Sequence, residues 1–185
     1  VTHIFHTAFL TKEKIKLIGK HNFKKTNLHI INTIAELMEI NPKARIVLSS
    51  SGAVLPFIEN KSNSDKDLYG YLKYLEELKL GQKNNALTLR IFALTGYFIR
   101  SPEVFALSEF IYSALNTKKI KIKANGLVLR SYASAEEIVE LSWKWLLSHK
   151  KGYAVNAASD NLDLLRIANI INTILGDIDI SHNMK

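Results

Sequence analysis

A tyrosine and a lysine that stand four residues apart could together move a proton. Tyr69 and Lys73 form the pattern Tyr-x-x-x-Lys. Four residues make about one turn of a helix, so the phenol and the ammonium would share one helix face. An ammonium beside a phenol stabilises the phenolate and lowers the pKa of the tyrosine. Such a tyrosine can take a proton from an alcohol near neutral pH. Because tyrosine and lysine also share helices by chance, the alternative is a solvated lysine beside a half-buried tyrosine.

Strands and helices alternate along the chain and must position this pair. Short apolar or β-branched segments predict strands at 2–7, 45–49, 86–93, 119–123 and 153–157. Apolar residues at helical spacing predict helices at 27–40, 68–79, 104–115, 135–147 and 162–175, with a polar loop at 59–67. This alternation is typical of an α/β domain with a mainly parallel sheet flanked by helices.

Three polar clusters each follow one of the predicted strands. They are His6-Thr7-Ala8, Ser49-Ser50-Ser51 and Thr95-Gly96. Ligands of open α/β sheets bind beyond the carboxyl ends of the strands, so we expect all three clusters at one edge of the sheet. For the serine run, the alternative is that the hydroxyl groups only satisfy a turn at the end of the strand.

The composition is that of an ordinary soluble globular domain. The chain has 185 residues, which is enough for one domain with its own core. It is 47% hydrophobic and 23% charged, as ordinary soluble domains are. No apolar run reaches the length of a membrane span, and the start of the chain lacks the features of a signal peptide. From this we expect no membrane partner. The sequence also has no cysteine, which fits a cytoplasmic protein. His3 and His6 have no apparent third ligand, and no metal site is expected.

The formal net charge of +8 could favour nucleic acid, anionic lipid or a phosphorylated small molecule. Lysines at 118, 119, 121 and 123 surround Ile120 and Ile122, a pattern that favours an edge strand protected by lysine. The sequence contains no zinc finger, RNA-binding aromatic motif or arginine stripe. We therefore expect no nucleic-acid partner.

Eight sites follow one another along the chain in a recognisable order. They are His3-Ile4-Phe5-His6-Thr7-Ala8, Asn27 at the opening of the next helix, Ile46-Val47-Leu48-Ser49-Ser50-Ser51, Tyr69 with Lys73, Leu89-Arg90-Ile91-Phe92-Ala93-Leu94-Thr95-Gly96, Arg130-Ser131-Tyr132, the acidic Glu137, and Tyr153-Ala154-Val155-Asn156. In this order they resemble segments of the extended short-chain dehydrogenase/reductases, specifically the NAD-dependent epimerase/dehydratase family that acts on nucleotide sugars. The resemblance implies a Rossmann-like fold with a small C-terminal substrate-binding part. Residues 1–100 would be the later part of a dinucleotide-binding domain. Residues 101–185 would mainly bind substrate, with some segments returning to the sheet.

The resemblance also implies roles for individual residues. Tyr69 would be the acid/base, Lys73 would lower its pKa and hold the cofactor ribose, and Ser51 would orient the reacting oxygen, a role for which Ser49 and Ser50 compete. The implied contacts to NAD or NADP come from Tyr69, Lys73, His6, Thr7, Ala8, Asn27, Ser49 and Phe92. The implied contacts to a nucleotide-sugar substrate come from Ser51 and Arg130, although Arg130 could equally form a surface ion pair with Glu136 or Glu137.

The chain departs from the family pattern in ways that bear on the cofactor and the substrate. The family begins with a glycine-rich phosphate loop, whereas no two of the eight glycines here are three residues apart. The start of the chain resembles the fourth strand of the family, so we expect that a first half of the nucleotide domain is absent from this sequence. Leu55-Pro56, Ala93 and Ser131 replace residues that are common in the family.

The sequence thus predicts an NAD(P)-dependent enzyme for nucleotide sugars, with an epimerase favoured over a reductase or a dehydratase. The alternative is a non-catalytic relative that binds a nucleotide or a protein partner. A homodimer is possible, through the helix at 27–40 and the helix that carries Tyr69.

Overall fold

The computed structural model describes residues 1–98, 105–158 and 160–182, which form two compact units. The first unit contains residues 1–91 and 139–157, and the second contains residues 92–138 and 158–185. The helices are α1 (Lys14–Ile40), α2 (Leu55–Ile58), α3 (Leu68–Glu76), α4 (Ala106–Thr117), α5 (Ala135–Leu146) and α6 (Leu164–Leu175). The strands are β1 (His3–His6), β2 (Arg45–Ser51), β3 (Ala86–Ile91), β4 (Ala93–Thr95), β5 (Lys119–Ile122), β6 (Leu129–Ser134), β7 (Tyr153–Ala157), β8 (Asp160–Asp163) and β9 (Asp179–His182).

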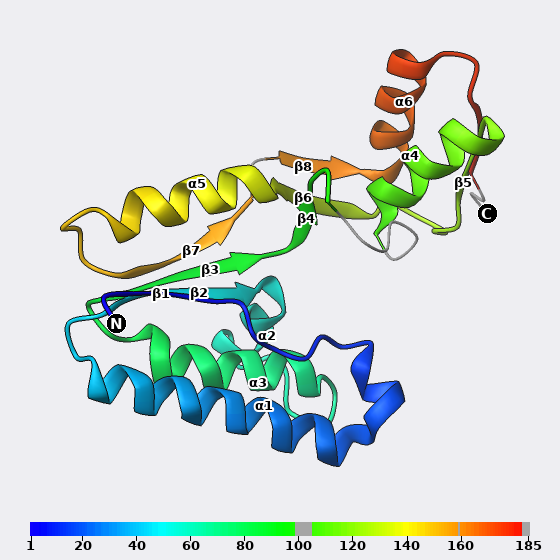
Figure 1. Cartoon of the computed structure of the whole chain (residues 1–185). Coiled ribbons are helices and arrows are strands. Elements are labelled where there is room, and N and C mark those ends of the chain that lie inside the picture. Colours follow the sequence, from blue (N-terminus) through cyan, green and yellow to red (C-terminus); the bar gives the residue numbers. More distant parts are fainter. Residues whose placement is uncertain (99–104, 159, 183–185) are drawn as a thin grey trace. The chain divides into compact units, whose positions relative to one another are not determined.

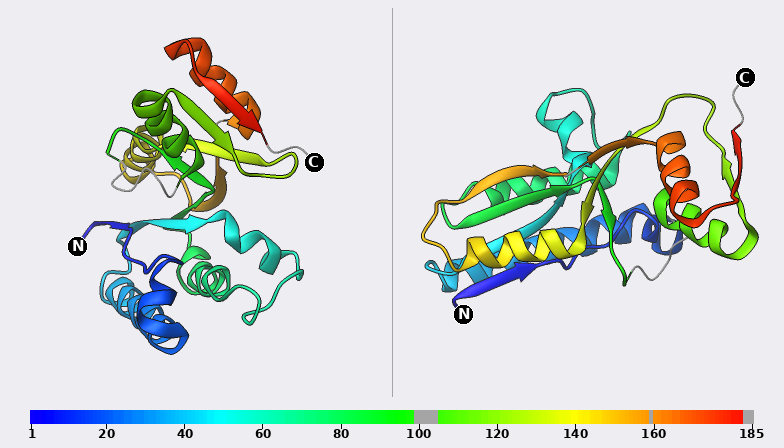
Figure 2. Two further views of the ribbon diagram at one scale, coloured as in Figure 1. Left: turned by 90° about the vertical axis from the view of Figure 1, so that its right-hand side faces the viewer. Right: turned by 90° about the horizontal axis from the view of Figure 1, so that it is seen from above.

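The first unit is built on a parallel sheet of four strands in the order β1-β2-β3-β7. Helices α1 and α3 lie against one face of this sheet, and α5 lies over the other (Figures 1 and 2). The core under α1 joins Ala35 and Met38 of the helix to Ile46 and Leu48 of β2. The Rossmann-like, mainly parallel sheet expected from the sequence is confirmed.

Alternate residues of the strands face the helices α1 and α3. On β2, Ile46 and Leu48 enter the core beneath α1, and the alternation of a strand then turns Ser50 toward the same helical layer. The register pairs Ser50 with Arg90 of β3 and Leu48 with His6 of β1. Three polar side chains of adjacent strands therefore face the helical layer near the carboxyl ends of these strands.

The second unit has its own core and two small sheets. Strands β4, β6 and β8 form one sheet, in which β6 and β8 are antiparallel, and β5 pairs with β9 in the other. The core packs α4 and α6 against β5 through residues such as Phe110, Ile120 and Ile171. As the lysine pattern predicted, the lysines of β5 are exposed while Ile120 and Ile122 are buried.

Several boundaries differ from the sequence prediction. Helix α1 begins at Lys14 rather than at residue 27, with a non-helical Gly19 (φ 76°) that marks a kink. The predicted strand 86–93 is divided, because β3 ends at Ile91 and β4 belongs to another sheet. Strands β6, β8 and β9 were not predicted. The predicted start of a helix at 104 lies outside the described residues, and α4 begins at Ala106.

The divided strand also makes one expectation about the sheet edge wrong. Thr95 pairs with Ser134 in the sheet of the second unit, so Thr95-Gly96 does not follow a strand of the four-stranded sheet. The other two clusters do, since His6 ends β1 and Ser51 ends β2.

A close approach at Gly70 fixes the position of α3 and yields a prediction. A Cβ atom at this position would lie 2.6 Å from the carbonyl oxygen of Ala53 and 2.8 Å from the ring of Phe57. We expect Gly70→Ala to lower the free energy of unfolding by about 1–3 kcal/mol, the usual cost of overpacking. Urea denaturation followed by circular dichroism measures this change. Gly126→Ala is the matched control, because no atom lies within 4 Å of a Cβ there. Equal stability of the two variants would contradict the close packing of α3.

Candidate active site

Helix α3 carries Tyr69 and Lys73 on adjacent turns, as the spacing predicted. The helix begins after Asp67, whose carboxylate accepts a hydrogen bond from the backbone N–H of Gly70 at 3.2 Å. Such an N-cap satisfies one of the free N–H groups of the first turn. Tyr69 is half-buried, whereas Lys73 is only 4% exposed. The alternative of a solvated lysine is therefore wrong.

Three groups of the protein contact the Lys73 ammonium. Its Nζ donates to the backbone carbonyl of Ser49 at 2.8 Å and to Oε2 of Glu76 at 2.9 Å. The ring of Phe9 covers it at 3.8 Å from Nζ to the ring centroid, a cation–π contact. Burial lowers the pKa of Lys73, and the charge and hydrogen bond of Glu76 act in the opposite direction.

The Tyr69 phenol is held between Ser51 and Phe9. The Phe9 and Tyr69 rings meet edge to face with their centroids 6.0 Å apart. Burial raises the pKa of Tyr69 above its usual 10.0, while a hydrogen bond with the Ser51 side chain lowers it. The lowered pKa that the sequence predicted for Tyr69 is wrong, because burial raises this pKa by more than Ser51 lowers it. The ammonium is directed to Ser49 and Glu76, and the Glu76 charge itself raises the pKa of Tyr69.

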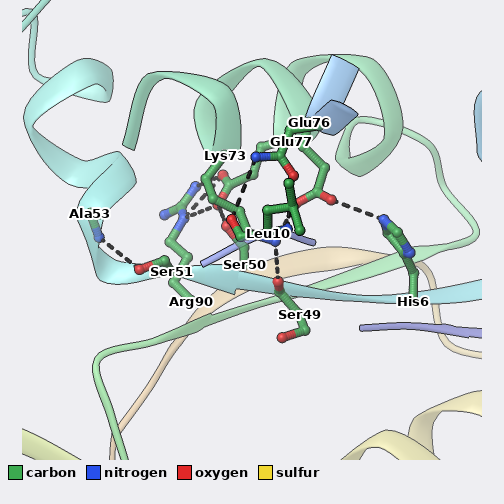
Figure 3. A network of polar contacts seen from close by, with 11 residues as sticks. His6, Leu10, Ser49, Ser50, Ser51, Ala53, Lys73, Glu76, Glu77 and Arg90 are labelled. Atoms are coloured by element: carbon green, nitrogen blue, oxygen red, sulfur yellow. Dashed lines mark hydrogen bonds and ion pairs between the residues drawn. The ribbon is translucent and has the colours of Figure 1, made fainter. Parts of the chain in front are cut away.

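Two consecutive carboxylates, Glu76 and Glu77, are buried, and Figure 3 shows them close to Lys73. Glu76 is 1% exposed, and its Oε1 lies 3.0 Å from Nε2 of His6 at the end of β1. Since a carboxylate only accepts hydrogen bonds, Nε2 of His6 carries the hydrogen in this contact. A polar chain thus runs from β1 through Glu76 and Lys73 to the carbonyl of Ser49 on β2.

The second carboxylate, Glu77, is neutralised by a different cation. Its two oxygens share the single N–H of Arg90 Nε, each at 3.1 Å, and Oε2 also accepts a hydrogen bond from a terminal guanidinium nitrogen at 2.8 Å. Ser50 donates a hydrogen bond to Glu77 Oε1 at 2.6 Å. The fork of an arginine matches a carboxylate well, so Glu77 is fully engaged with β2 and β3.

Sequence reasoning missed both glutamates, although a signal for them existed. Glu76 and Glu77 follow Lys73 at three and four residues, and both are helical neighbours of that lysine. Glu76 also lies midway between Leu72 and Leu80, which are fully buried. An acid on the apolar face of a helix indicates a buried partner.

The residues expected near a cofactor are placed differently from one another. His6 is buried and contacts Glu76, whereas Thr7 and Ala8 are exposed just after β1. Asn27 is fully buried inside α1, and its side-chain oxygen accepts a hydrogen bond from the backbone N–H of Leu10 at 2.8 Å. Asn27 does not open the helix as the sequence predicted. In this structure it holds the loop between β1 and α1.

The remaining predicted residues divide between the two units. Ser49 contributes its backbone carbonyl to the contact with Lys73. Phe92 is 41% exposed and Arg130 is exposed on β6, and both belong to the second unit. Glu137 accepts a hydrogen bond from the backbone N–H of Ser134, whose side chain accepts one from the N–H of Glu137. This reciprocal pair is a capping box at the start of α5.

Metal-binding groups and membrane-spanning helices can be assessed for the described residues 1–98, 105–158 and 160–182. Within these ranges, no group of three or more histidine or acidic residues could hold a metal ion. No helix in them has both the length and the apolar character that crossing a membrane requires.

Comparison with known proteins identifies the family. The profile of the NAD dependent epimerase/dehydratase family matches residues 1–158. The chain belongs to the NAD-dependent epimerase/dehydratase family. The resemblance stated from the sequence is thereby confirmed. Comparison with curated proteins gives no match.

Solved structures of similar fold include three nucleotide-sugar enzymes. A UDP-N-acetylglucosamine 4-epimerase from Methanobrevibacter ruminantium, in complex with UDP-N-acetylmuramic acid, has a TM-score of 0.80 at 22% identity over 100% of this chain. An ADP-L-glycero-D-manno-heptose-6-epimerase from Helicobacter pylori has a TM-score of 0.79 at 21% identity over 97% of this chain. A dTDP-glucose 4,6-dehydratase from Bacillus anthracis, in complex with NAD, has a TM-score of 0.70 at 16% identity over 100% of this chain. The chain spans only 64%, 60% and 61% of these three proteins, in that order.

The contact between Ser51 and Tyr69 yields a prediction about the phenol. Because burial raises the pKa of Tyr69 and Ser51 opposes this effect, we expect the phenol to stay protonated above pH 10 and Ser51→Ala to raise its pKa further. Titration of ¹³Cζ-labelled tyrosine by NMR measures both pKa values, and Tyr69→Phe assigns the signal. Ser49→Ala is the control, since it keeps the carbonyl that Lys73 uses. A Tyr69 pKa below 10, or one unmoved by Ser51→Ala, would refute this description of the site.

Proposed function

We propose that this chain supplies the proton-transfer site of an NAD(P)-dependent enzyme that acts on a nucleotide-linked sugar. The observation that carries the proposal is the convergence of Tyr69, Lys73 and Ser51 at the carboxyl end of β2. A phenol, an ammonium and a hydroxyl at this edge of a parallel sheet match the needs of a reacting sugar alcohol. Membership of the family supports the same chemistry. An epimerase is the first choice, with a reductase or a dehydratase next.

The phenol of Tyr69 can serve both directions of hydride transfer. A protonated phenol is a general acid, so Tyr69 donates its proton to the oxygen of a sugar carbonyl as that carbon is reduced. In the reverse direction the phenolate accepts the proton of the sugar hydroxyl. Ser51, whose side chain lowers the pKa of the phenol, orients the same oxygen. Lys73 supplies a fixed positive charge that stabilises the phenolate whenever it forms.

The described residues fit one end of a nicotinamide cofactor. When bound, this group accepts or returns the hydride. Lys73 would hold a ribose hydroxyl, and the exposed Thr7 and Ala8 would border the ring beyond β1. Asn27 would act through the loop that it holds at Leu10. The sequence contains no glycine-rich loop for the diphosphate, so the proposed contacts concern the nicotinamide end alone.

We propose Arg130 as a contact to the diphosphate of the substrate. A guanidinium binds a diphosphate through paired hydrogen bonds, and Arg130 is exposed on β6. The similar structures contain UDP-N-acetylmuramic acid or are named for ADP- and dTDP-linked sugars, which favours a nucleoside diphosphate sugar here. A homodimer through α1 and α3 stays a prediction.

The lack of a glycine-rich loop gives a prediction for the 185-residue chain by itself. Backbone N–H groups at a helix N-terminus normally bind the pyrophosphate of a dinucleotide. We therefore expect isothermal titration of the isolated chain with NAD to show weak binding or none. Tight, saturable binding would contradict this expectation and would show that other residues of the chain bind the diphosphate.

The role of Tyr69 gives the direct test of the proposed function. In an active protein that contains this chain, we expect Tyr69→Phe to reduce turnover of its nucleotide sugar by about 100- to 10,000-fold, the usual contribution of a general acid or base. The affinity for NAD should change little, because the ring is kept. Tyr74→Phe is the control on the same helix, where the ring stacks on Phe57 at 6.1 Å.

Steady-state kinetics and equilibrium cofactor binding measure the two effects separately. If Tyr69→Phe keeps most of its activity on every nucleotide sugar that the wild-type protein converts, Tyr69 is structural. The non-catalytic alternative then becomes the better interpretation.

A further inference from the structure

The side chain of Lys73 is held by other parts of the first unit. Its ammonium has three hydrogens. One is donated to the carbonyl of Ser49 and one to Glu76, and the Phe9 ring covers the ammonium as well. The placement of Lys73 therefore depends on these three groups.

Of the three, only Glu76 carries a charge and is itself fixed from a second direction. The His6 ring contacts the other carboxylate oxygen at 3.0 Å, and the side chains of His6 and Glu76 are 2% and 1% exposed. The carboxylate thus cannot rotate toward solvent without losing both partners. Glu77 is not available as a substitute, because Arg90 and Ser50 already occupy it.

We propose that Glu76, anchored by His6, is a positioning residue that fixes the Lys73 ammonium at the end of β2. The inference rests on the proposed role of Lys73 in cofactor binding. It adds a residue pair, Glu76 and His6, that touches neither cofactor nor substrate and acts through the lysine.

The charge of Lys73 gives a readout that a merely structural role would not move. Burial lowers the pKa of Lys73, and Glu76 opposes this through its charge and its hydrogen bond, with a smaller effect from Glu77. These two carboxylates are the charged groups that face the ammonium. His6 of β1 and Arg90 of β3 are connected to it through the carboxylates. Removing the Glu76 charge should therefore let burial lower the pKa of Lys73 further.

The test is a pH titration of the Lys73 side chain by NMR, on protein labelled with ¹⁵N and ¹³C in its lysines. We expect Glu76→Gln to lower the pKa of Lys73 by about one unit or more, since the loss of a close opposite charge shifts a pKa by that amount. Glu140→Gln is the matched control, because Glu140 forms an exposed pair with Lys144. A pKa of Lys73 that is equal in Glu76→Gln and in the wild type overturns the proposal.

A second variant keeps the test valid if Glu76→Gln fails to fold. Glu76→Asp retains the charge but shortens the side chain by one methylene, so the carboxylate cannot reach both His6 and Lys73. We expect a smaller fall in the Lys73 pKa and faster solvent exchange of its ammonium hydrogens. An Asp variant with the pKa and exchange rate of the wild type also overturns the proposal.

The outcome is distinguishable from a failure of the proposed function. A lower Lys73 pKa in Glu76→Gln, together with full activity of Tyr69→Phe, supports the positioning role and rejects the catalytic one. In an active protein, the high-pH loss of activity should move to lower pH in Glu76→Gln by the same amount as the Lys73 pKa.

Discussion

Two adjacent buried carboxylates must be neutralised where α3 meets the sheet, and the rest of the site depends on this constraint. An unpaired buried charge costs on the order of several kcal/mol, so Glu76 and Glu77 each require a cation and further hydrogen bonds. Lys73 and Arg90 supply the charges. His6 and Ser50 supply the hydrogen bonds. Because these partners come from β1, β2, β3 and α3 itself, the register of the sheet and the position of the helix are tied together.

Within this network the phenol of Tyr69 has a raised pKa, whereas an ammonium beside a phenol would by itself lower it. Lys73 is turned toward Ser49 and Glu76, so the phenol of Tyr69 is governed by burial and by Ser51. A neutral phenol and an ammonium fixed by other groups therefore lie within about one helical turn of each other. A neutral acid beside a fixed positive charge suits protonation of an oxygen that becomes negative during reduction.

The sequence predicted the parts of this structure that depend on local pattern. The helix that carries Tyr69 and Lys73 and the strand at 45–49 follow from periodicity. The mainly parallel sheet follows from the alternation of strands and helices. It did not predict the division of the strand after Ile91, because the residues 86–93 form one continuous β-rich run and only tertiary packing assigns Ala93–Thr95 to a second sheet. The expected direction of the Tyr69 pKa was wrong for a related reason. Burial raises this pKa most, and the charge of Glu76 adds to the rise. Both effects depend on how α3 packs on the sheet.

The central claim is that Tyr69 and Lys73 act on a bound sugar and cofactor from opposite ends of one helical turn. A crystal structure of an active protein containing this chain, with NAD and a nucleotide sugar bound, tests it most directly. The account predicts the phenol oxygen of Tyr69 at about 2.6–3.2 Å from a sugar hydroxyl. It also predicts Lys73 still paired with Glu76, with a ribose hydroxyl where the Phe9 ring now covers the ammonium. A sugar bound away from Tyr69, with Phe9 still covering Lys73, would contradict the account.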